Sequence, residues 1–214
     1  MLNFEKPEYK ITEYVENNNY GKFELEPLER GFGTTLGNAL RRVMLSSMPG
    51  SAIVAVKIDG VMHEFQTIEG VVEDVTAIIL NLKGIVIKNH TSEVKKAHLS
   101  VSKEGTVTAA DIECDADVEI INKDQVIATL SKGGKLDMEF IIANGRGAVL
   151  APDNKKYIEN GAIGYIPVDA LYSPIERINF YVDNARVGQD ASYDKLTVEV
   201  ETNGSIKPEE AMAL

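Results

Sequence analysis

The stretch from residue 25 to residue 50 constrains this chain most, because it leads a turn-rich segment into a long amphipathic helix. Thr34 or Thr35 can supply the side-chain oxygen that caps the first free N–H groups of a helix. The pair Pro49-Gly50 is typical of a helix end, since proline cannot continue the hydrogen-bond ladder. We therefore predict a helix that runs from this cap to about Met48.

The predicted helix has two sides of different chemistry. Leu36, Leu40, Val43 and Ser47 share one face at helical spacing, and Asn38, Arg42 and Leu45 share a neighbouring face. Between residues 34 and 50 the only charged residues are Arg41 and Arg42, although the whole chain carries a net charge of −11. This local reversal of sign separates the helix from the acidic remainder of the chain.

Three interpretations of the stretch compete. A phosphate-binding loop fits poorly, because the spacing G-x-G-x-x-x-G departs from the dinucleotide fingerprint and no G-K-[ST] follows. A core helix with two solvated arginines is the ordinary explanation of an amphipathic pattern. An interface helix would use an apolar stripe for one partner and an arginine-leucine pair for another, since the planar guanidinium of arginine bonds carboxylates and carbonyls bidentately.

A resemblance to a known family rests on blocks that occur in one order along nearly the whole chain. The chain resembles the N-terminal domain of the bacterial RNA polymerase alpha subunit, and this resemblance favours the interface interpretation of the helix. The matching blocks are Glu26 to Pro49, Ile58 to Val61, Glu69 to Val71 with Glu73-Asp74, Leu80 to Gly84, Val107 to Ile112, Asp169-Ala170, Tyr172 to Pro174 and Glu201 to Gly204.

The expected fold class is α+β. Pattern alone indicates a chain of mixed helices and clustered strands. The resemblance implies a nested arrangement of two domains. Residues 1–50 plus 175–214 would form a dimerisation and assembly domain, and residues 51–174 would form an α+β domain inserted into it.

The resemblance also implies a function. Alpha subunits are non-catalytic scaffolds of a nucleotidyltransferase: two copies dimerise, the dimer nucleates assembly of the β and β′ subunits, and sigma joins for DNA-templated transcription. The chain would then be part of an enzyme without an active site of its own. A homodimeric protein-binding module outside the polymerase is the alternative, and a stable complex with β would separate the two.

Contact residues carry over by motif. Arg42, the second arginine of the A-L-R-R run, and Leu45 match positions that contact the β subunit. The residues that would face the second alpha copy are Phe32, Leu36 and Val43.

The segment expected to form the inserted domain supplies the remaining partner contacts. Lys83 of the N-L-K-G run and Val168 match positions tied to contact with β′. The family's full-length chain continues through a linker to a small DNA-binding domain. Because this sequence ends at Leu214, the resemblance implies no direct DNA binding by this chain.

Composition excludes several other functions. A net charge of −11 argues against broad binding to the phosphates of DNA. The single cysteine, Cys114, excludes an internal disulfide and fits a reducing compartment. No secretory signal or membrane span is visible, so we expect a soluble, cytoplasmic protein.

No metal, cofactor or catalytic group is expected on this chain. Its histidines, His63, His90 and His98, lack the spacing of a zinc site. The acidic run 111–117 lacks the glycine that a calcium loop needs at its sixth position, where Ala116 stands. We interpret this run as a solvated acidic loop.

The remaining elements follow from period and turn residues. Helices are predicted over Val71 to Leu82, ended by Lys83-Gly84, and from Pro208 onward. Hairpin turns are predicted at Asn17 to Asn19, Asp59-Gly60 and Lys132 to Lys135, with Asn144 to Gly161 a long loop. The predicted strands are 10–15, 20–25, 52–58, 61–65, 85–88, 98–101, 118–121, 125–130, 136–142, 175–182 and 195–201.

Overall fold

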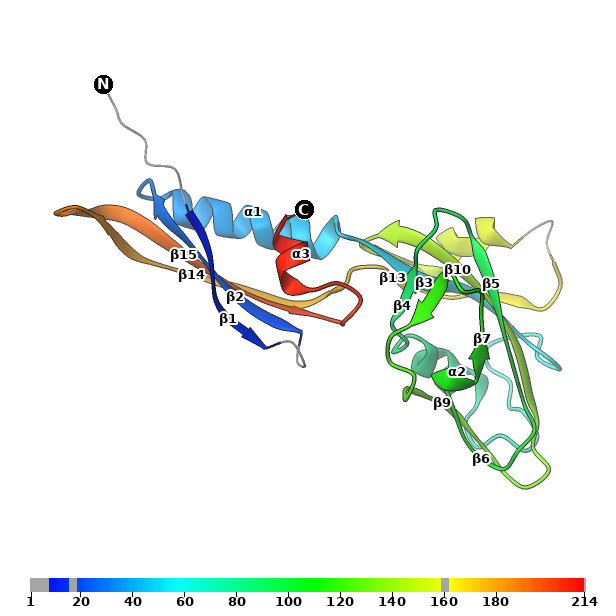
Figure 1. Ribbon diagram of the computed structural model, residues 1–214. Helices are drawn as coiled ribbons and strands as arrows, with labels where there is room; N and C mark the ends of the chain where they lie inside the picture. The colour runs from blue at the N-terminus through cyan, green and yellow to red at the C-terminus, as the bar shows by residue number, and fades with distance from the viewer. Residues whose placement is uncertain (1–7, 16–18, 159–161, 214) are drawn as a thin grey trace. The chain divides into compact units, whose positions relative to one another are not determined.

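The computed structural model describes residues 8–15, 19–158 and 162–213. The chain forms two compact units, which are coloured along the sequence in Figure 1. The discontinuous unit comprises Met1–Met48 and Ser173–Leu214, and the inserted unit comprises Pro49–Tyr172. Helices and strands are mixed in both units, which confirms the α+β class.

The discontinuous unit is one antiparallel sheet covered by helices. Its strands lie in the order β1-β2-β15-β14, so the two ends of the sequence pair in the middle of the sheet. The helix α1 (Phe32–Ser46) lies along one face of this sheet (Figure 1), and α3 (Pro208–Ala213) packs against it near the C-terminus. The strand bounds are β1 (Glu8–Val15), β2 (Tyr20–Leu28), β14 (Ile175–Val187) and β15 (Asp190–Thr202).

Alternation along β15 places the core of this unit. Val198 and Val200 are fully buried, whereas Glu199 and Glu201 face away from the core. This confirms the alternation expected of a strand with one buried face. A turn is predicted at Asn17 to Asn19, but its first two residues lie outside the part of the chain that the structure describes. Asn19 itself adopts a left-handed conformation with φ of 53°.

The helix α1 begins and ends earlier than the sequence predicts. Its N-cap residue is Gly31, in a left-handed conformation with φ of 87°, and no side chain of Thr34 or Thr35 caps it. At the other end the N–H of Ser47 bonds the carbonyl of Val43, and a strand already begins at Pro49. The strand that begins at Pro49 therefore limits the helix, which the helical spacing of the apolar residues predicts to reach Met48.

The inserted unit contains a larger sheet whose strand order is β7-β5-β10-β3-β4-β8, with β12 paired to β3. Two pairs of short strands, β6 with β9 and β11 with β13, complete it. The bounds in the large sheet are β3 (Pro49–Ile58), β4 (Ile87–Asn89), β5 (Lys95–Val101), β7 (Ile112–Glu113), β8 (Val118–Ile120), β10 (Leu136–Arg146) and β12 (Tyr165–Pro167). The other strands are β6 (Gly105–Thr108), β9 (Val126–Leu130), β11 (Ala148–Val149) and β13 (Ala170–Leu171).

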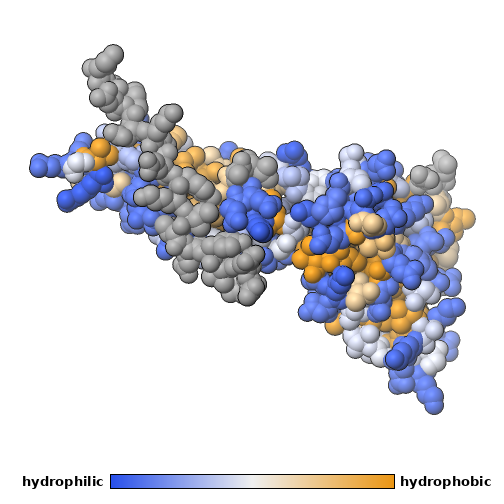
Figure 2. Space-filling view, in the orientation of Figure 1, coloured by the Kyte–Doolittle hydropathy of each residue, from blue (hydrophilic) through white to orange (hydrophobic). Residues whose placement is uncertain are grey.

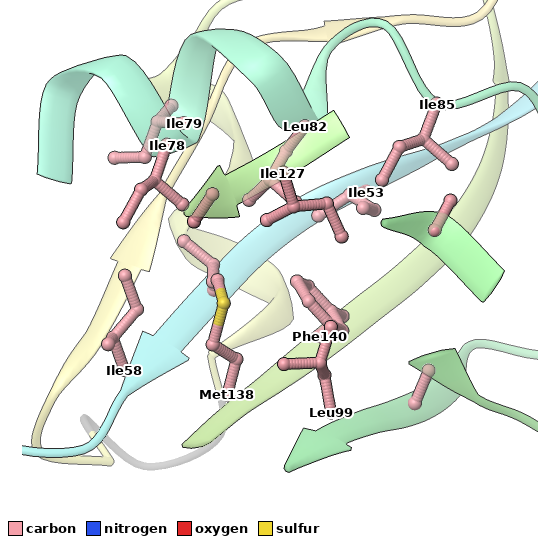
Figure 3. Packing of buried hydrophobic residues seen from close by; sticks show 14 of the residues in the cluster. Ile53, Ile58, Ile78, Ile79, Leu82, Ile85, Leu99, Ile127, Met138 and Phe140 are labelled. Atoms are coloured by element: carbon pink, nitrogen blue, oxygen red, sulfur yellow. The ribbon is translucent and has the colours of Figure 1, made fainter. Parts of the chain in front are cut away.

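The helix α2 (Val75–Leu82) closes the core of the inserted unit. Its side chains and those of β3, β5, β9 and β10 point into one apolar cluster (Figure 3). The Asp74 carboxylate accepts a hydrogen bond from the Ala77 N–H at 2.8 Å and starts the helix. The predicted start at Val71 is wrong, because Val71 bridges Leu130 and the Val72 N–H bonds the Thr129 carbonyl, so this backbone pairs with β9 instead.

Two predicted hairpins are absent from the described residues. Gly60 does turn the chain with φ of 81°, but residues 61–65 form no strand, and β3 pairs with β10, β4 and β12 instead. The turn at 132–135 forms, yet it joins strands of different sheets. Here β9 pairs with β6, a strand that the sequence analysis missed, while β10 pairs with β5 and β3. In both cases the strands pair with segments distant in the sequence instead of with the neighbouring one.

The region predicted as a long loop at 144–161 is more ordered than expected. The strand β10 continues to Arg146, β11 follows, and a 3₁₀ segment, η3, spans Ala151–Tyr157. Within it the buried Asn154 side chain donates to the carbonyl of Val168 at 2.7 Å. Residues 159–161 lie outside the described residues. None of the described helices is long and apolar enough to cross a membrane.

Candidate protein interface on the first helix

A carboxylate from β15 holds the start of α1. Asp194 Oδ2 accepts hydrogen bonds from the backbone N–H of Gly31 at 2.8 Å and of Gly33 at 3.1 Å. The first turn of the helix carries no acidic residue of its own, so Asp194 supplies the negative charge that the positive end of a helix dipole favours. The sequence analysis missed Asp194, because nothing nearby in the chain marks it as a cap.

Glycines bring the middle of α1 close to the sheet. Gly33, Gly37 and Met44 are the buried residues of the helix. A methyl group at Gly37 would overlap the ring of Phe180 on β14, so the helix can lie this close only because no side chain intervenes. At the end of the helix, the Ser173 hydroxyl donates to the carbonyl of Met44 at 3.4 Å. These contacts determine which side of α1 faces the sheet.

The outward side of α1 carries the predicted contact residues. Arg42 comes about two and a half turns after the buried Gly33 and therefore points away from the sheet. Leu45, three residues later, lies on the same side of the helix and is 43% exposed. The structure thus brings Arg42 and Leu45 together at the surface.

A second exposed side of α1 is apolar. Phe32 and Val43 are 48% and 49% exposed, a large fraction for side chains of this size. Leu36 lies between them on the helix, but it is half-buried and packs partly against the core of its own unit. Of the three residues predicted to face a second copy, two are freely available and one is shared with the core.

The two adjacent arginines differ in their surroundings. The Arg41 guanidinium lies 5.1 Å from the centroid of the Phe180 ring, and its Nη2 donates to Asn38 Oδ1 at 3.3 Å. The Arg42 guanidinium has no hydrogen-bond, ion-pair or ring partner within the part of the chain that the structure describes. All the guanidinium donors of Arg42 are therefore available to another molecule, whereas Arg41 already uses one of its donors within its own unit.

In the inserted unit, the structure separates the two residues predicted to contact β′. Lys83 is exposed at the end of α2, and its Nζ lies 3.4 Å from Asp169 Oδ2. Val168 is only 5% exposed: its side chain packs in the core and its N–H donates to the Val54 carbonyl at 3.0 Å. The expectation of a surface role for Val168 is therefore corrected, because its apolar side chain points inward.

The surface group next to Val168 is Asp169. Its Oδ1 accepts the Ala151 N–H at 2.7 Å, and this bond, followed by the nearby Lys83 ammonium, lowers the pKa of the carboxyl below its ordinary value. Lys83 and Asp169 thus form a fixed, exposed ion pair. The sequence motif that singled out Lys83 contained no signal for this partner, 86 residues away.

Further apolar side chains lie exposed on the inserted unit, and Figure 2 shows hydrophobic residues among charged ones on its visible face. The sequence predicts a strand over residues 61–65. No strand forms there: the side chains of Met62 and Phe65 lie at the surface, whereas Val61 is buried in the core. The exposed large hydrophobic residues of this unit include Met62, Phe65, Val72, Leu80, Leu150, Ile163 and Leu171.

The titratable side chains form scattered pairs. His90 lies 3.3 Å from Glu119, and His98 lies 2.9 Å from Asp137. Among the described residues, no three His, Cys, Asp or Glu side chains are arranged to hold a metal ion. Burial and then the charge of Asp115 raise the pKa of the Cys114 thiol, which disfavours the reactive thiolate.

The comparisons with known proteins agree on one family. The family model for the RNA polymerase Rpb3/RpoA insert domain matches residues 56–173. Over its full length the chain is 56% identical to the DNA-directed RNA polymerase subunit alpha of Desulforamulus reducens and 52% identical to that of Oceanobacillus iheyensis. It covers 67% and 68% of these proteins, so it spans about two thirds of their length.

A third relative extends the agreement. The subunit alpha of Symbiobacterium thermophilum is 55% identical over 211 residues, which are 99% of this chain and 66% of that protein. These matches cover both units, including the helix that presents Arg42. The chain therefore belongs to the bacterial DNA-directed RNA polymerase alpha subunit family.

Proposed function

We propose that this chain is a non-catalytic, cytoplasmic scaffold of bacterial RNA polymerase. It would dimerise through one side of α1, hold the β subunit through another, and so nucleate assembly of a nucleotidyltransferase. One observation carries this proposal: the buried glycine face of α1 leaves exposed both an apolar side with Phe32 and Val43 and a polar side with Arg42 and Leu45. The names of the relatives support the polymerase as the assembly concerned.

Dimerisation follows from the apolar side. Full burial of a side chain the size of phenylalanine or valine contributes roughly 1.5–3 kcal/mol. In a two-fold dimer the same patch of both copies is buried, so each residue counts twice. Phe32 and Val43, helped by the half-buried Leu36, therefore supply a substantial apolar contribution to association.

Binding of β follows from the polar side. Arginine is enriched among the residues that dominate interface energies, and its planar guanidinium can bond a carboxylate or two carbonyls at once. Because no described residue pairs with the Arg42 guanidinium, it can meet a partner without first breaking a contact within its own chain. Leu45 beside it adds apolar area to the same surface.

The dimer meets two different large subunits with identical surfaces. We infer that one copy uses its Arg42 side against β. The inserted unit of the other copy would meet β′, with the exposed pair of Lys83 and Asp169 in place of the buried Val168. Sigma and other subunits would join through the assembled enzyme rather than through this chain alone.

The test of the β contact compares Arg42→Ala with Arg186→Ala, which removes an exposed arginine from β14. Each variant is mixed with purified bacterial β subunit, and complexes are measured by pull-down and light scattering. We expect Arg42→Ala to remain dimeric and to lose β by tenfold or more, about 1.4 kcal/mol. The control should keep β. Retention of β by Arg42→Ala at native affinity would refute the assignment.

The test of the dimer contact is Val43→Glu, which places a charge in the proposed apolar interface. We expect light scattering to show a monomer, whereas Thr35→Glu, exposed on a different side of α1, should stay dimeric. If Val43→Glu is still a dimer, the apolar side does not form the interface. The standalone binding module has no support from the relatives, and a native dimer that ignores β would be needed to restore it.

A further inference from the structure

The position of Arg41 assigns it a different task from that of Arg42. Its guanidinium lies 5.1 Å from the centroid of the Phe180 ring, within the range of a cation–π interaction. The same guanidinium donates to Asn38 Oδ1 one turn earlier in α1. Arg41 is thus engaged with its own unit, although it is exposed and directly precedes Arg42.

The Phe180 ring packs against α1 at the place where Gly37 leaves no side chain in the way. Gly37, one turn before Arg41, approaches the ring so closely that a methyl group there would overlap it. Arg41 then covers the ring from the next turn along. A ring held between a glycine and a guanidinium resists rotation of the helix, because turning α1 in either direction separates Arg41 from Phe180 or drives the neighbouring turns into the ring.

We propose that Arg41 is a positioning residue for assembly of the polymerase. Together with Phe180 it fixes the rotation of α1 on β14, so that the guanidinium of Arg42 points away from the sheet and toward β. This inference rests on the proposed role of Arg42. It matters because the Arg42 guanidinium lies at the end of a long side chain, so a small rotation of the helix displaces it more than it displaces the backbone.

The other hydrogen bonds to α1 hold its ends, while Leu36, Leu40 and Met44 pack its apolar face against the core. Asp194 bonds the N–H groups at the start of the helix, and Ser173 bonds the Met44 carbonyl near its end. The contact of Arg41 with Phe180 is one residue from Arg42 and acts on the turn that presents it. The two neighbouring arginines therefore have different roles: Arg41 orients the helix and Arg42 contacts the partner.

The experiment is a double-mutant cycle on the affinity of the intact dimer for purified β subunit. The variants are Arg41→Ala, Phe180→Leu and the two combined, with Arg186→Ala as the surface control. We expect each single variant to weaken binding about two- to fivefold, the range of an exposed cation–π contact. The double variant should bind β no more weakly than the single variant with the lower affinity, because both substitutions remove the same contact.

Conservative variants separate positioning from simple loss of structure. Arg41→Lys keeps a cation over the ring and should recover part of the affinity, and Phe180→Tyr keeps the ring face and should lose less than Phe180→Leu. Light scattering and thermal unfolding on the same samples show whether the dimer and fold persist. A merely structural role would lower the unfolding temperature without the partial recovery of β affinity by Arg41→Lys.

Three results would overturn the inference. Native affinity in Arg41→Ala shows that its contact with Phe180 is irrelevant to β. If adding Arg41→Ala to Phe180→Leu lowers the affinity for β by as much as Arg41→Ala does in the native chain, Arg41 contacts β itself. If Arg42→Ala keeps β, the proposed function of this surface fails and the inference falls with it. If Arg42→Ala releases β while the variants of Arg41 and Phe180 do not, the proposed function stands and only the role of Arg41 is removed.

Discussion

Asp194 and Gly31 are joined by a hydrogen bond of 2.8 Å although 163 residues separate them in the chain. The same carboxylate bonds Gly33 at 3.1 Å and lies buried beneath the start of α1. The helix that carries the proposed interface therefore depends on a cap from β15. A helix without this cap would leave buried N–H groups unsatisfied, which costs free energy.

We predict that Asp194→Ala lowers the free energy of unfolding by about 1–2 kcal/mol, as the loss of a helix cap does. Urea unfolding followed by circular dichroism, at one fixed protein concentration, measures this. Asp194→Asn keeps an acceptor without the charge and should lose less. Asp183→Ala, which removes an exposed carboxylate from β14, is the control. Equal stability of Asp194→Ala and this control would contradict the capping role.

Gly37→Ala tests the close approach of α1 to β14. Helix propensity alone would stabilise this variant by about 1 kcal/mol. We expect a net destabilisation of about 1–3 kcal/mol instead, because the added methyl overlaps the Phe180 ring and forces the helix outward. The same urea measurement applies.

Gly33→Ala serves as the graded comparison. There the new methyl would lie 3.0 Å from Val182 Cγ1 and 3.1 Å from Asp194 Oδ2, which is tight but leaves room for small shifts. We expect a smaller loss than in Gly37→Ala. A Gly37→Ala variant more stable than the native chain would show that the helix does not need to lie this close to the sheet.

The ion pair of Lys83 and Asp169 predicts a pH dependence. Hydrogen bonding from Ala151, followed by Lys83, lowers the pKa of Asp169 below its ordinary value of 3.8. The folded state therefore favours the ionised form, and this stabilisation is fully present above pH 3.8 and is lost as pH falls through the lower folded pKa. Both groups are nearly half exposed, so screening keeps the contribution below about 1 kcal/mol.

Urea unfolding of the native protein and of Asp169→Asn between pH 3 and pH 7, which bracket the ordinary pKa of 3.8, measures this contribution. The native chain should be the more stable at neutral pH, and the difference should shrink toward the acid end. Glu104→Gln, which alters an exposed carboxylate in a surface turn, should show no such trend. A difference that stays constant with pH would show that the charge of Asp169 contributes nothing.

The single cysteine predicts a slow thiol reaction. Burial, and then the negative charge of Asp115, raise the pKa of Cys114, so little thiolate is present near neutral pH. We expect the folded chain to react with a disulfide reagent several-fold more slowly than the chain unfolded in urea. Asp115→Asn should react at an intermediate rate. Equal rates in the folded and unfolded chains would contradict a protected thiol.

Local pattern predicted the elements that carry the proposed interface. The spacing of apolar residues indicated α1, placed Arg42 with Leu45, and separated them from Leu36 and Val43, whereas the role of Phe32 came from the resemblance. The alternation of Val198 and Val200 with glutamates indicated a half-buried strand. These features repeat within a few residues, and the period of a helix or strand is itself a local property.

Tertiary structure decided what local pattern could not. The cap of α1 is Asp194 rather than Thr34 or Thr35, and the neighbour of Lys83 at the surface is Asp169 while Val168 turns inward. Residues 61–65 have the composition of a strand but find no partner strand. In each case the outcome depends on groups far apart in sequence, and burial and hydrogen bonding between such groups exist only once the chain has folded. The sequence by itself determined the family, the helix and its chemistry, whereas only the folded chain determined which side of that helix remains free.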